Sequence, residues 1–272
     1  DDPASGFAVY AAPPRFSTAY WAARNRIGVL VETHAWKDYA TRVKSTRDAI
    51  VGALAAVATK GPALLEAASK ADASAAKLGG TSLAVVQAPS GPPRTIDFKG
   101  YSYKREPSAI SGGTKIVYDE RRPEVWKVPL VDKLKPAVSV KLPKAGYLVP
   151  PAHAPWMRER LAAHGIDFQE IAAAKPALEV EAFRATETTF GSAPYEGRQT
   201  LKAAGSWAKE KQDVSAGSLF VPIAQRNARL VAHLFEPMAP DSFLAWGFFN
   251  GHFERKEYME AYEDTIRRTA TP

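Results

Sequence analysis

The chain has 272 residues, of which 46% are hydrophobic, so it exceeds a typical single domain and can bury a sizeable core. It contains no cysteine, which excludes disulfides, thiolate metal sites and a cysteine nucleophile. The formal net charge is +7, but lysine and arginine are scattered among nearly as many acids without a nucleic-acid motif, so we expect no nucleic-acid partner.

Ile27 to Val31 is the first predicted element, a short β-branched apolar run bounded by charged residues. Such a run is typical of a strand that is covered on both faces of a sheet. Glu32 follows it directly, so we expect this carboxylate at the carboxyl edge of the sheet, where open α/β sheets form their clefts. A carboxylate in that position either acts as a general base or interacts with the helix that comes next.

The residues after Glu32 predict an amphipathic helix, because apolar side chains recur at the spacing of one helix face. These side chains are Trp36, Tyr39, Val43, Ile50, Leu54 and Val57. Gly61-Pro62 predicts a break, and an alanine-rich stretch from Ala63 to Leu78 predicts a second helix that stops at Gly79-Gly80. Strand, carboxylate and helices together predict an α/β unit in residues 1–79.

The same region carries a set of motifs in a fixed order. They are Pro14-Arg15-Phe16-Ser17, Tyr20, Arg24-Asn25-Arg26 and Leu30-Val31-Glu32-Thr33-His34. In this order the motifs resemble the end of the catalytic domain of zinc metallocarboxypeptidases, the carboxypeptidase A superfamily, and most of all its large bacterial members with a C-terminal extension. The resemblance reaches to the end of the first predicted helix, and the rest of the chain is similar to the extension.

The resemblance implies a zinc-dependent hydrolase that acts on a peptide substrate and is secreted or periplasmic. Glu32 matches the glutamate that takes a proton from the zinc-bound water and returns it to the leaving amine. Tyr10 lies upstream, where the family has a mobile tyrosine that covers the substrate. Arg15 or Arg24 is expected to bind the C-terminal carboxylate of the peptide through a bidentate pair.

The zinc ligands of the family are a His-x-x-Glu pair and a later histidine, and all of them precede the catalytic glutamate. Only residues 1–31 precede Glu32 here, so those ligands cannot occur in their family order. We therefore expect the C-terminal portion of such an enzyme. Alone, this portion is expected to hold no zinc securely and to hydrolyse no peptide.

Two weaker pairs of metal ligands occur in the sequence. His233-Leu234-Phe235-Glu236 has the His-x-x-Glu spacing, but it lies inside an apolar run that favours a packed or hydrogen-bonded histidine. Glu32 and His34 are two residues apart and would share one face of a strand. Two ligands do not close a tetrahedral zinc site, so neither pair predicts a metal centre by itself.

Residues 80–272 predict a β-rich antiparallel module of the α+β type with terminal helices. The expected strands cover residues 81–88, 95–98, 113–118, 124–128, 137–142, 177–190, 198–204 and 218–221. The expected helices cover residues 154–164, 225–235 and 254–268. The sequence thus predicts the α/β end of a carboxypeptidase-like catalytic domain followed by an accessory extension, with the boundary after residue 79.

Residues 27–31 raise a physical difficulty. Most strands with which they would pair in the family are missing, which leaves unpaired backbone groups and apolar side chains. An upstream catalytic fragment, self-association with a second copy, or the β-rich region must cover them. Another class of function stays open, in which the chain is a non-catalytic binding or assembly module and Glu32 is structural.

The sequence contains no uninterrupted apolar stretch that approaches the roughly 20 residues needed to cross a bilayer, so it predicts no membrane span. No charged and then apolar leader opens the chain, so we expect any export signal of the parent protein upstream of Asp1.

Overall fold

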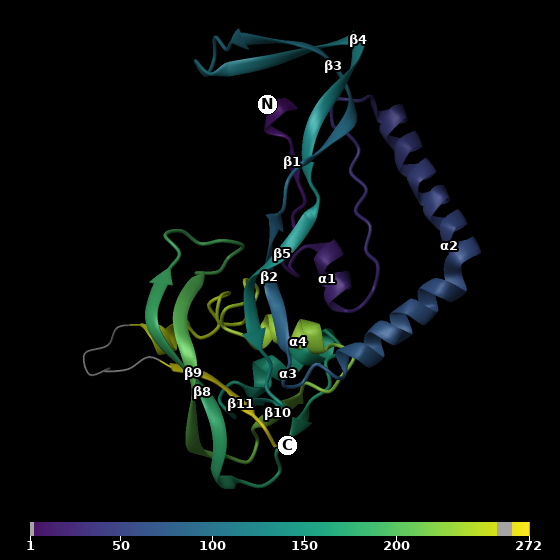
Figure 1. Cartoon of the computed structure of the whole chain (residues 1–272). Helices are drawn as coiled ribbons and strands as arrows, with labels where there is room; N and C mark the ends of the chain where they lie inside the picture. The colour runs from purple at the N-terminus through teal and green to yellow at the C-terminus, as the bar shows by residue number, and fades with distance from the viewer. Residues whose placement is uncertain (1–2, 255–262, 272) are drawn as a thin grey trace. The chain divides into compact units, whose positions relative to one another are not determined.

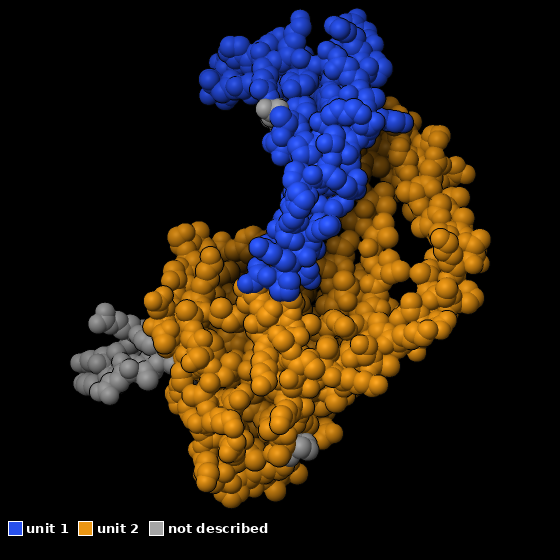
Figure 2. Space-filling model, in the orientation of Figure 1, with its two compact units in different colours: residues 1–11, 87–137 blue, residues 12–86, 138–272 orange. Residues whose placement is uncertain are grey.

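The computed structural model describes residues 3–254 and 263–271, in which helices combine with mainly antiparallel strands in a mixed α+β fold (Figure 1). The chain divides into two compact units, which Figure 2 colours separately. The smaller unit comprises residues 1–11 and 87–137, and the larger unit comprises residues 12–86 and 138–272. The expected boundary after residue 79 falls inside the larger unit.

The smaller unit is built on a long antiparallel hairpin. β3 (Arg94–Pro107) pairs with β4 (Thr114–Val131) along the whole length of β3. The short β1 (Phe7–Ala8) follows the 3-10 helix η1 (Pro3–Ser5) and lies parallel to the end of β4. The N-terminal residues of the chain are thereby tied to a strand that lies more than a hundred positions later in the sequence.

β4 is continuous where the sequence predicted two separate strands, at residues 113–118 and 124–128. The pairing register explains the difference. Tyr101 of β3 pairs with Pro123, whereas the next residue of β3 pairs with Asp119, so the intervening residues of β4 form a bulge. A bulge interrupts the ladder locally and lets the strand continue, although the sequence there reads as a turn.

Gly100 and Trp126 form a close cross-strand contact in this hairpin. A Cβ atom added to Gly100 would lie only 2.4 Å from the Trp126 ring. The missing side chain therefore lets the indole lie across β3, where Phe98 stacks on it at 6.0 Å between ring centroids. Contacts between aromatic side chains on one sheet face stabilise a hairpin that has few other apolar residues to bury.

β2 (Ser82–Ser90) and β5 (Lys133–Lys141) pair as a two-stranded sheet, close to the strands that the sequence predicted at residues 81–88 and 137–142. Each of these strands runs from one unit into the other. The chain therefore leaves the larger unit through β2 and returns to it through β5.

The larger unit contains a sheet of six strands in which every neighbouring pair is antiparallel. In spatial order the strands are β7 (Gln169–Glu170), β10 (Leu219–Pro222), β6 (Gly146–Val149), β11 (Glu263–Thr269), β8 (Lys175–Phe190) and β9 (Leu201–Val214). The expected return of residues 198–204 against 177–190 is confirmed by the β8–β9 pairing.

The C-terminal end differs from its prediction. The sequence predicted a helix over residues 254–268, of which 255–262 lie outside the described residues. Residues 263–269 form β11 and lie between β6 and β8. Residues 267–269 pair on both sides, and this tertiary gain overrides their local helical pattern.

The core of the larger unit lies between its sheet and its short helices. α3 (Ala154–Ala163) and α4 (Ala228–Phe235) present their apolar sides to it, as their spacing predicted. α4 buries Ala228, Leu230, Val231, Ala232 and Phe235. α5 (Asn250–Phe253) is a single turn that buries Phe253. Fully burying a large apolar side chain contributes roughly 1.5–3 kcal/mol, so α4 is a principal contributor to this core.

α2 (Tyr39–Ala75) is one helix of 37 residues, so the predicted break at Gly61-Pro62 is wrong. Asp38 caps its start by accepting a hydrogen bond from the Thr41 backbone N–H. Pro62 cannot donate to the carbonyl one turn earlier, and α2 changes direction part-way along its length (Figure 1). The proline thus bends the helix without ending it. Ala75 is the only buried residue recorded for α2.

Candidate functional site

Residues 27–33 do not form the buried strand that the sequence predicted. They have no regular secondary structure and are unpaired, and Ile27 and Val29 are 75% and 76% exposed. A strand requires a neighbour that satisfies its backbone groups, and no described strand takes that place. Glu32 is consequently exposed and does not lie at the edge of a sheet. Within the larger unit, the described strands do not cover these apolar side chains.

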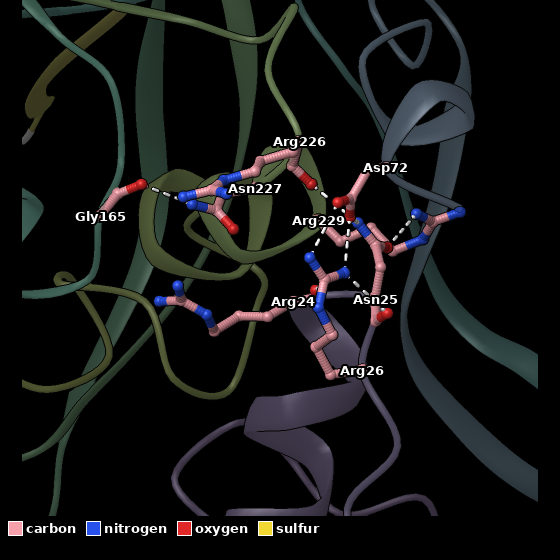
Figure 3. Close-up of polar contacts among 8 residues, drawn as sticks. All are labelled: Arg24, Asn25, Arg26, Asp72, Gly165, Arg226, Asn227 and Arg229. Carbon is pink, nitrogen blue, oxygen red and sulfur yellow. Dashed lines mark hydrogen bonds and ion pairs between the residues drawn. The ribbon is translucent and has the colours of Figure 1, made fainter. Parts of the chain in front are cut away.

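Residues directly before this segment are firmly attached to the larger unit. Arg26 donates from both terminal nitrogens to Asp72 near the end of α2, at 2.8 and 2.9 Å. Asn25 donates from Nδ2 to the same carboxylate at 3.0 Å and to the Arg226 carbonyl at 2.8 Å. Figure 3 shows these groups converging from α1, α2 and the start of α4. The exposed segment therefore begins at a fixed point.

Asn25 completes this cluster in an uncommon backbone conformation. Its φ is 60°, in the left-handed region, which asparagine tolerates better than most residues. This conformation lets the side chain donate to Asp72 while its Oδ1 accepts from Arg229 Nη1 at 2.7 Å. The hydrogen bonds from Arg26, followed by burial in the opposite direction, leave a net lowering of the Asp72 pKa. The carboxylate thus stays ionised at neutral pH.

A groove opens beside this cluster, between α2 and the residues that follow α1 (Ser17–Ala23). Its volume is about 830 Å³. Its walls are mostly apolar and include Ala22, Ile27, Val57, Leu64, Leu65 and Ala68. Arg26, Asp72 and Arg229 supply its charged groups. A groove of this kind suits an apolar ligand or segment that also carries a polar group.

The apolar side chains of α2 continue this surface along the helix. We call Tyr39, Val43, Ile50, Leu54, Val57 and Leu65 the apolar strip; they follow helical spacing, and each of them is exposed. Leu65 is 74% exposed and Leu54 is 64% exposed. A contiguous apolar surface on a folded protein usually marks a site of interaction with a protein or a membrane.

α2 is also long and apolar enough to cross a membrane, by length and composition alone, which the sequence reading did not predict. Its charged residues include two pairs at i,i+4, namely Lys44 with Asp48 and Lys70 with Glu66, each at 2.6 Å. Charged pairs opposite an apolar strip are typical of an amphipathic helix that lies against an apolar surface.

The other residues that the sequence singled out as substrate ligands do not form one site within either unit. Tyr10 is 70% exposed and belongs to the smaller unit, whereas Arg15 and Arg24 belong to the larger unit. Arg15 donates to Asp241 from its backbone N–H at 2.7 Å and from Nη1 at 2.6 Å. Arg24 donates to the His164 carbonyl and to the Tyr20 hydroxyl. Both guanidinium groups therefore hold parts of the larger unit together.

Neither weak metal-ligand pair forms a site. His34 accepts a hydrogen bond at Nδ1 from the Trp36 backbone N–H, which makes it part of a local turn. Glu236 is fully buried and accepts from Tyr147 Oη at 2.5 Å and from Arg268 Nε at 3.0 Å. Burial raises the pKa of Glu236, and Arg268 opposes that rise. His233 has a buried Nδ1 without a hydrogen-bond partner among the described residues, and Glu236, the other member of the His-x-x-Glu spacing, is engaged by Tyr147 and Arg268.

No group of three or more histidines, aspartates and glutamates lies close enough to hold a metal ion within residues 3–254 and 263–271. The described residues of this chain therefore do not form a zinc site.

His153 and His252 form a pair that sequence reasoning missed, because 99 residues separate them. Their Nε2 atoms lie 3.2 Å apart, and Trp156 Nε1 lies 3.3 Å from His153 Nδ1. The indole can only donate, so His153 Nδ1 accepts and its Nε2 carries the proton toward His252. Burial, and then the charge of His252, lower the pKa of His153. The lowered pKa favours the neutral form of His153 at neutral pH.

Comparisons with protein-family models, with curated proteins and with solved structures each gave no match to this chain. The resemblance to metallocarboxypeptidases thus rests on the residues from Tyr10 to His34 and on the helix that follows them.

Proposed function

We propose that this chain is the C-terminal portion of a zinc metallocarboxypeptidase, and that residues 27–65 pack against the rest of the catalytic domain. The observation that carries the proposal is the uncovered apolar surface formed by Ile27, Val29 and the apolar strip. Burial of such surface favours association by about 25 cal/mol per Å². An uncovered surface of this kind is expected where a core segment lacks its neighbours.

The anchored start of the segment supports the same proposal. Asn25 and Arg26 are fixed to Asp72, and residues 27–31 leave this point without a strand partner. A neighbouring strand from the rest of the domain would satisfy the backbone of these residues and order them. Glu32 would then stand at the end of a buried strand, where a carboxylate can accept a proton from an attacking water and pass it to the leaving amine.

Glu32 is the one catalytic group that this proposal assigns to the chain. The zinc ligands implied by the resemblance have no counterpart among the described residues and have to come from the upstream part of the enzyme. We therefore expect no hydrolysis by this polypeptide alone.

The test uses the protein with its natural upstream region and measures the release of C-terminal residues from peptides. Glu32→Gln is expected to lower the rate about 10²–10⁴-fold, which is the usual contribution of general acid–base catalysis. Glu66→Gln is the matched control, because Glu66 is an exposed glutamate that pairs only with Lys70 on the surface of α2. Equal rates for Glu32→Gln and the unchanged protein would overturn the proposal.

A second function is favoured by the exposure of Glu32. An exposed carboxylate without an ion pair among the described residues suits a non-catalytic binding or assembly module as well as an incomplete enzyme. In that case the apolar strip binds a partner, whereas the protein with its upstream region shows no hydrolysis at all. Partner binding that is unchanged by Glu32→Gln and lost on substitution of the strip would favour the module.

A further inference from the structure

Arg229 is a cation at the groove beside α2 that has only a neutral partner. Its Nη1 donates to Asn25 Oδ1 at 2.7 Å, and no ion pair of Arg229 is recorded within residues 3–254 and 263–271. Asp72, the carboxylate that lines the same groove, already accepts from Arg26 and from Asn25. The charge of Arg229 is therefore available to a ligand that enters the groove.

The guanidinium of Arg229 is held in place before any ligand arrives. Asn25 is fixed by its own donations to Asp72 and to the Arg226 carbonyl, and its Oδ1 orients Arg229 (Figure 3). Holding a side chain in its bound geometry removes much of the entropy cost of forming the next hydrogen bonds. Arg229 can therefore offer a planar fork to a carboxylate, which binds such a fork through two parallel hydrogen bonds.

The surroundings of Arg229 define what else the ligand must carry. Ile27, Leu64 and Leu65 line the groove with apolar side chains, and the volume of about 830 Å³ accommodates several side chains. The charges of Arg26 and Asp72 cancel, which leaves the groove with one net positive charge from Arg229. A ligand that matches these features has aliphatic side chains on one side and a carboxylate at its edge.

We infer that the groove binds an amphipathic polypeptide segment whose aliphatic side chains pack against α2 and whose aspartate or glutamate pairs with Arg229. The inference rests on the proposed function, in which another part of the protein covers this surface, and it specifies the chemistry of the covering segment. Charge complementarity carries this choice, since the chain has a net charge of +7 and its free groove cation is preorganised.

Two labelled helical peptides test the inference with the chain as it is. Each peptide has leucines along one face; one carries glutamates at the edge of that face and the other carries lysines in the same positions. The glutamate peptide is expected to bind at least about tenfold more tightly, which corresponds to about 1.4 kcal/mol. Raising the salt concentration from about 0.05 M to about 0.5 M should reduce this preference, because salt screens exposed charges.

Arg229→Gln should remove the preference for the glutamate peptide, while Arg229→Lys should keep part of it because the charge remains. Arg226→Gln is the matched control: Arg226 is an exposed neighbour whose carbonyl holds Asn25, and Figure 3 shows its side chain directed away from Arg229. Binding after this change should stay within about twofold, since Arg226 is exposed and does not line the groove.

Leu65→Asp keeps Arg229 but breaks the apolar wall, so it should weaken the binding of both peptides. Circular dichroism and urea unfolding check that each variant is folded. If Arg229→Gln does not fold, Arg229→Lys provides the test of the arginine's role. Equal binding of the two peptides that is insensitive to Arg229→Gln would overturn the inference. Binding of anionic lipid vesicles in preference to the glutamate peptide would overturn it as well and would point to a membrane surface.

These results separate the inference from the proposed function. A glutamate preference that depends on Arg229, without hydrolysis by the protein that includes its upstream region, would leave the inference standing and remove the carboxypeptidase assignment. Hydrolysis that depends on Glu32, without any glutamate preference at the groove, would support the carboxypeptidase assignment and remove the inference.

Discussion

Asp72 binds both terminal nitrogens of the Arg26 guanidinium, at 2.8 and 2.9 Å, and so joins the end of α2 to the segment that leads to Glu32. The two residues lie 46 positions apart, and Asn25, next to Arg26, also donates to Asp72. The exposed segment and α2 thus form a loop whose two ends are held together. The position of Glu32 relative to the rest of the larger unit depends on this closure.

Asp72→Asn is expected to loosen that closure. The pair is partly exposed, with 38% of the Arg26 side chain and 23% of the Asp72 side chain open to solvent, so the loss in unfolding free energy should be about 1 kcal/mol. The backbone of residues 24–27 should exchange its amide hydrogens faster, which hydrogen exchange detects. Asp48→Asn is the control, because Asp48 pairs with Lys44 on the exposed side of α2. Unchanged exchange at residues 24–27 would contradict a role for Asp72.

The same pair also predicts a response to acid. The pKa of Asp72 is lowered chiefly by its hydrogen bonds from Arg26, so the folded chain binds a proton there less readily than the unfolded chain. The stabilisation is therefore present above the ordinary aspartate pKa of 3.8 and is lost as the pH falls through the lower folded value. Amide exchange at residues 24–27 should rise in this acid window in the unchanged protein, and Asp72→Asn should abolish that rise.

The buried contacts of Glu236 predict a larger loss. Tyr147 and Arg268 both donate to this carboxylate, and all three side chains are buried. Removing one partner of a buried pair leaves an uncompensated charge, so Arg268→Met should cost about 3–5 kcal/mol in unfolding free energy. Arg158→Met is the control, since Arg158 makes only an exposed pair with Glu170. Urea unfolding measures the free energy of unfolding of both variants. A smaller loss for Arg268→Met than for Arg158→Met would contradict the buried ion pair.

Parts of this fold follow from local sequence pattern. β8 and β9 were predicted because apolar and polar residues alternate in β8 and a turn follows, and Val180 and Ala182 are indeed buried. α4 was predicted from its helical spacing, and its apolar side is in the core. In each case the partner surface lies within the same chain, so the local pattern and the tertiary packing agree.

Other parts could not be predicted from local pattern. Ile27 to Val31 has the residues of a buried strand, but a strand forms only where a neighbour accepts its hydrogen bonds, and local sequence does not show that neighbour. The groove likewise depends on Arg26 meeting Asp72 and on Asn25 meeting Arg229, across 46 and 204 positions. The polar run Arg24-Asn25-Arg26 beside an apolar stretch was the one local feature of the sequence that marked the place of the groove.

Three half-buried histidines, His153, His164 and His233, predict how stability depends on pH near neutrality. Burial is the main cause that lowers the pKa of each. The unfolded chain therefore binds protons near the ordinary value of 6.5 that the folded chain does not bind, so stability falls as the pH drops through 6.5. Urea midpoints should decrease between about pH 7.5 and about pH 5.5. Replacing all three with glutamine should flatten this dependence, whereas His34→Gln should not.

The apolar strip of α2 is expected to matter for association with a partner but to contribute little to the stability of the chain. Ile50 and Leu54 are 54% and 64% exposed, so replacing both with glutamate removes little buried surface and should change the unfolding free energy by at most about 0.5 kcal/mol. The same change places charges where a covering polypeptide would pack, so self-association and binding of an upstream fragment should fall sharply in analytical ultracentrifugation. Lys44→Glu and Lys70→Glu, on the charged side of the helix, provide the control. A loss of several kcal/mol instead would mean that the chain itself buries the strip, and the surface would then be no site for a partner.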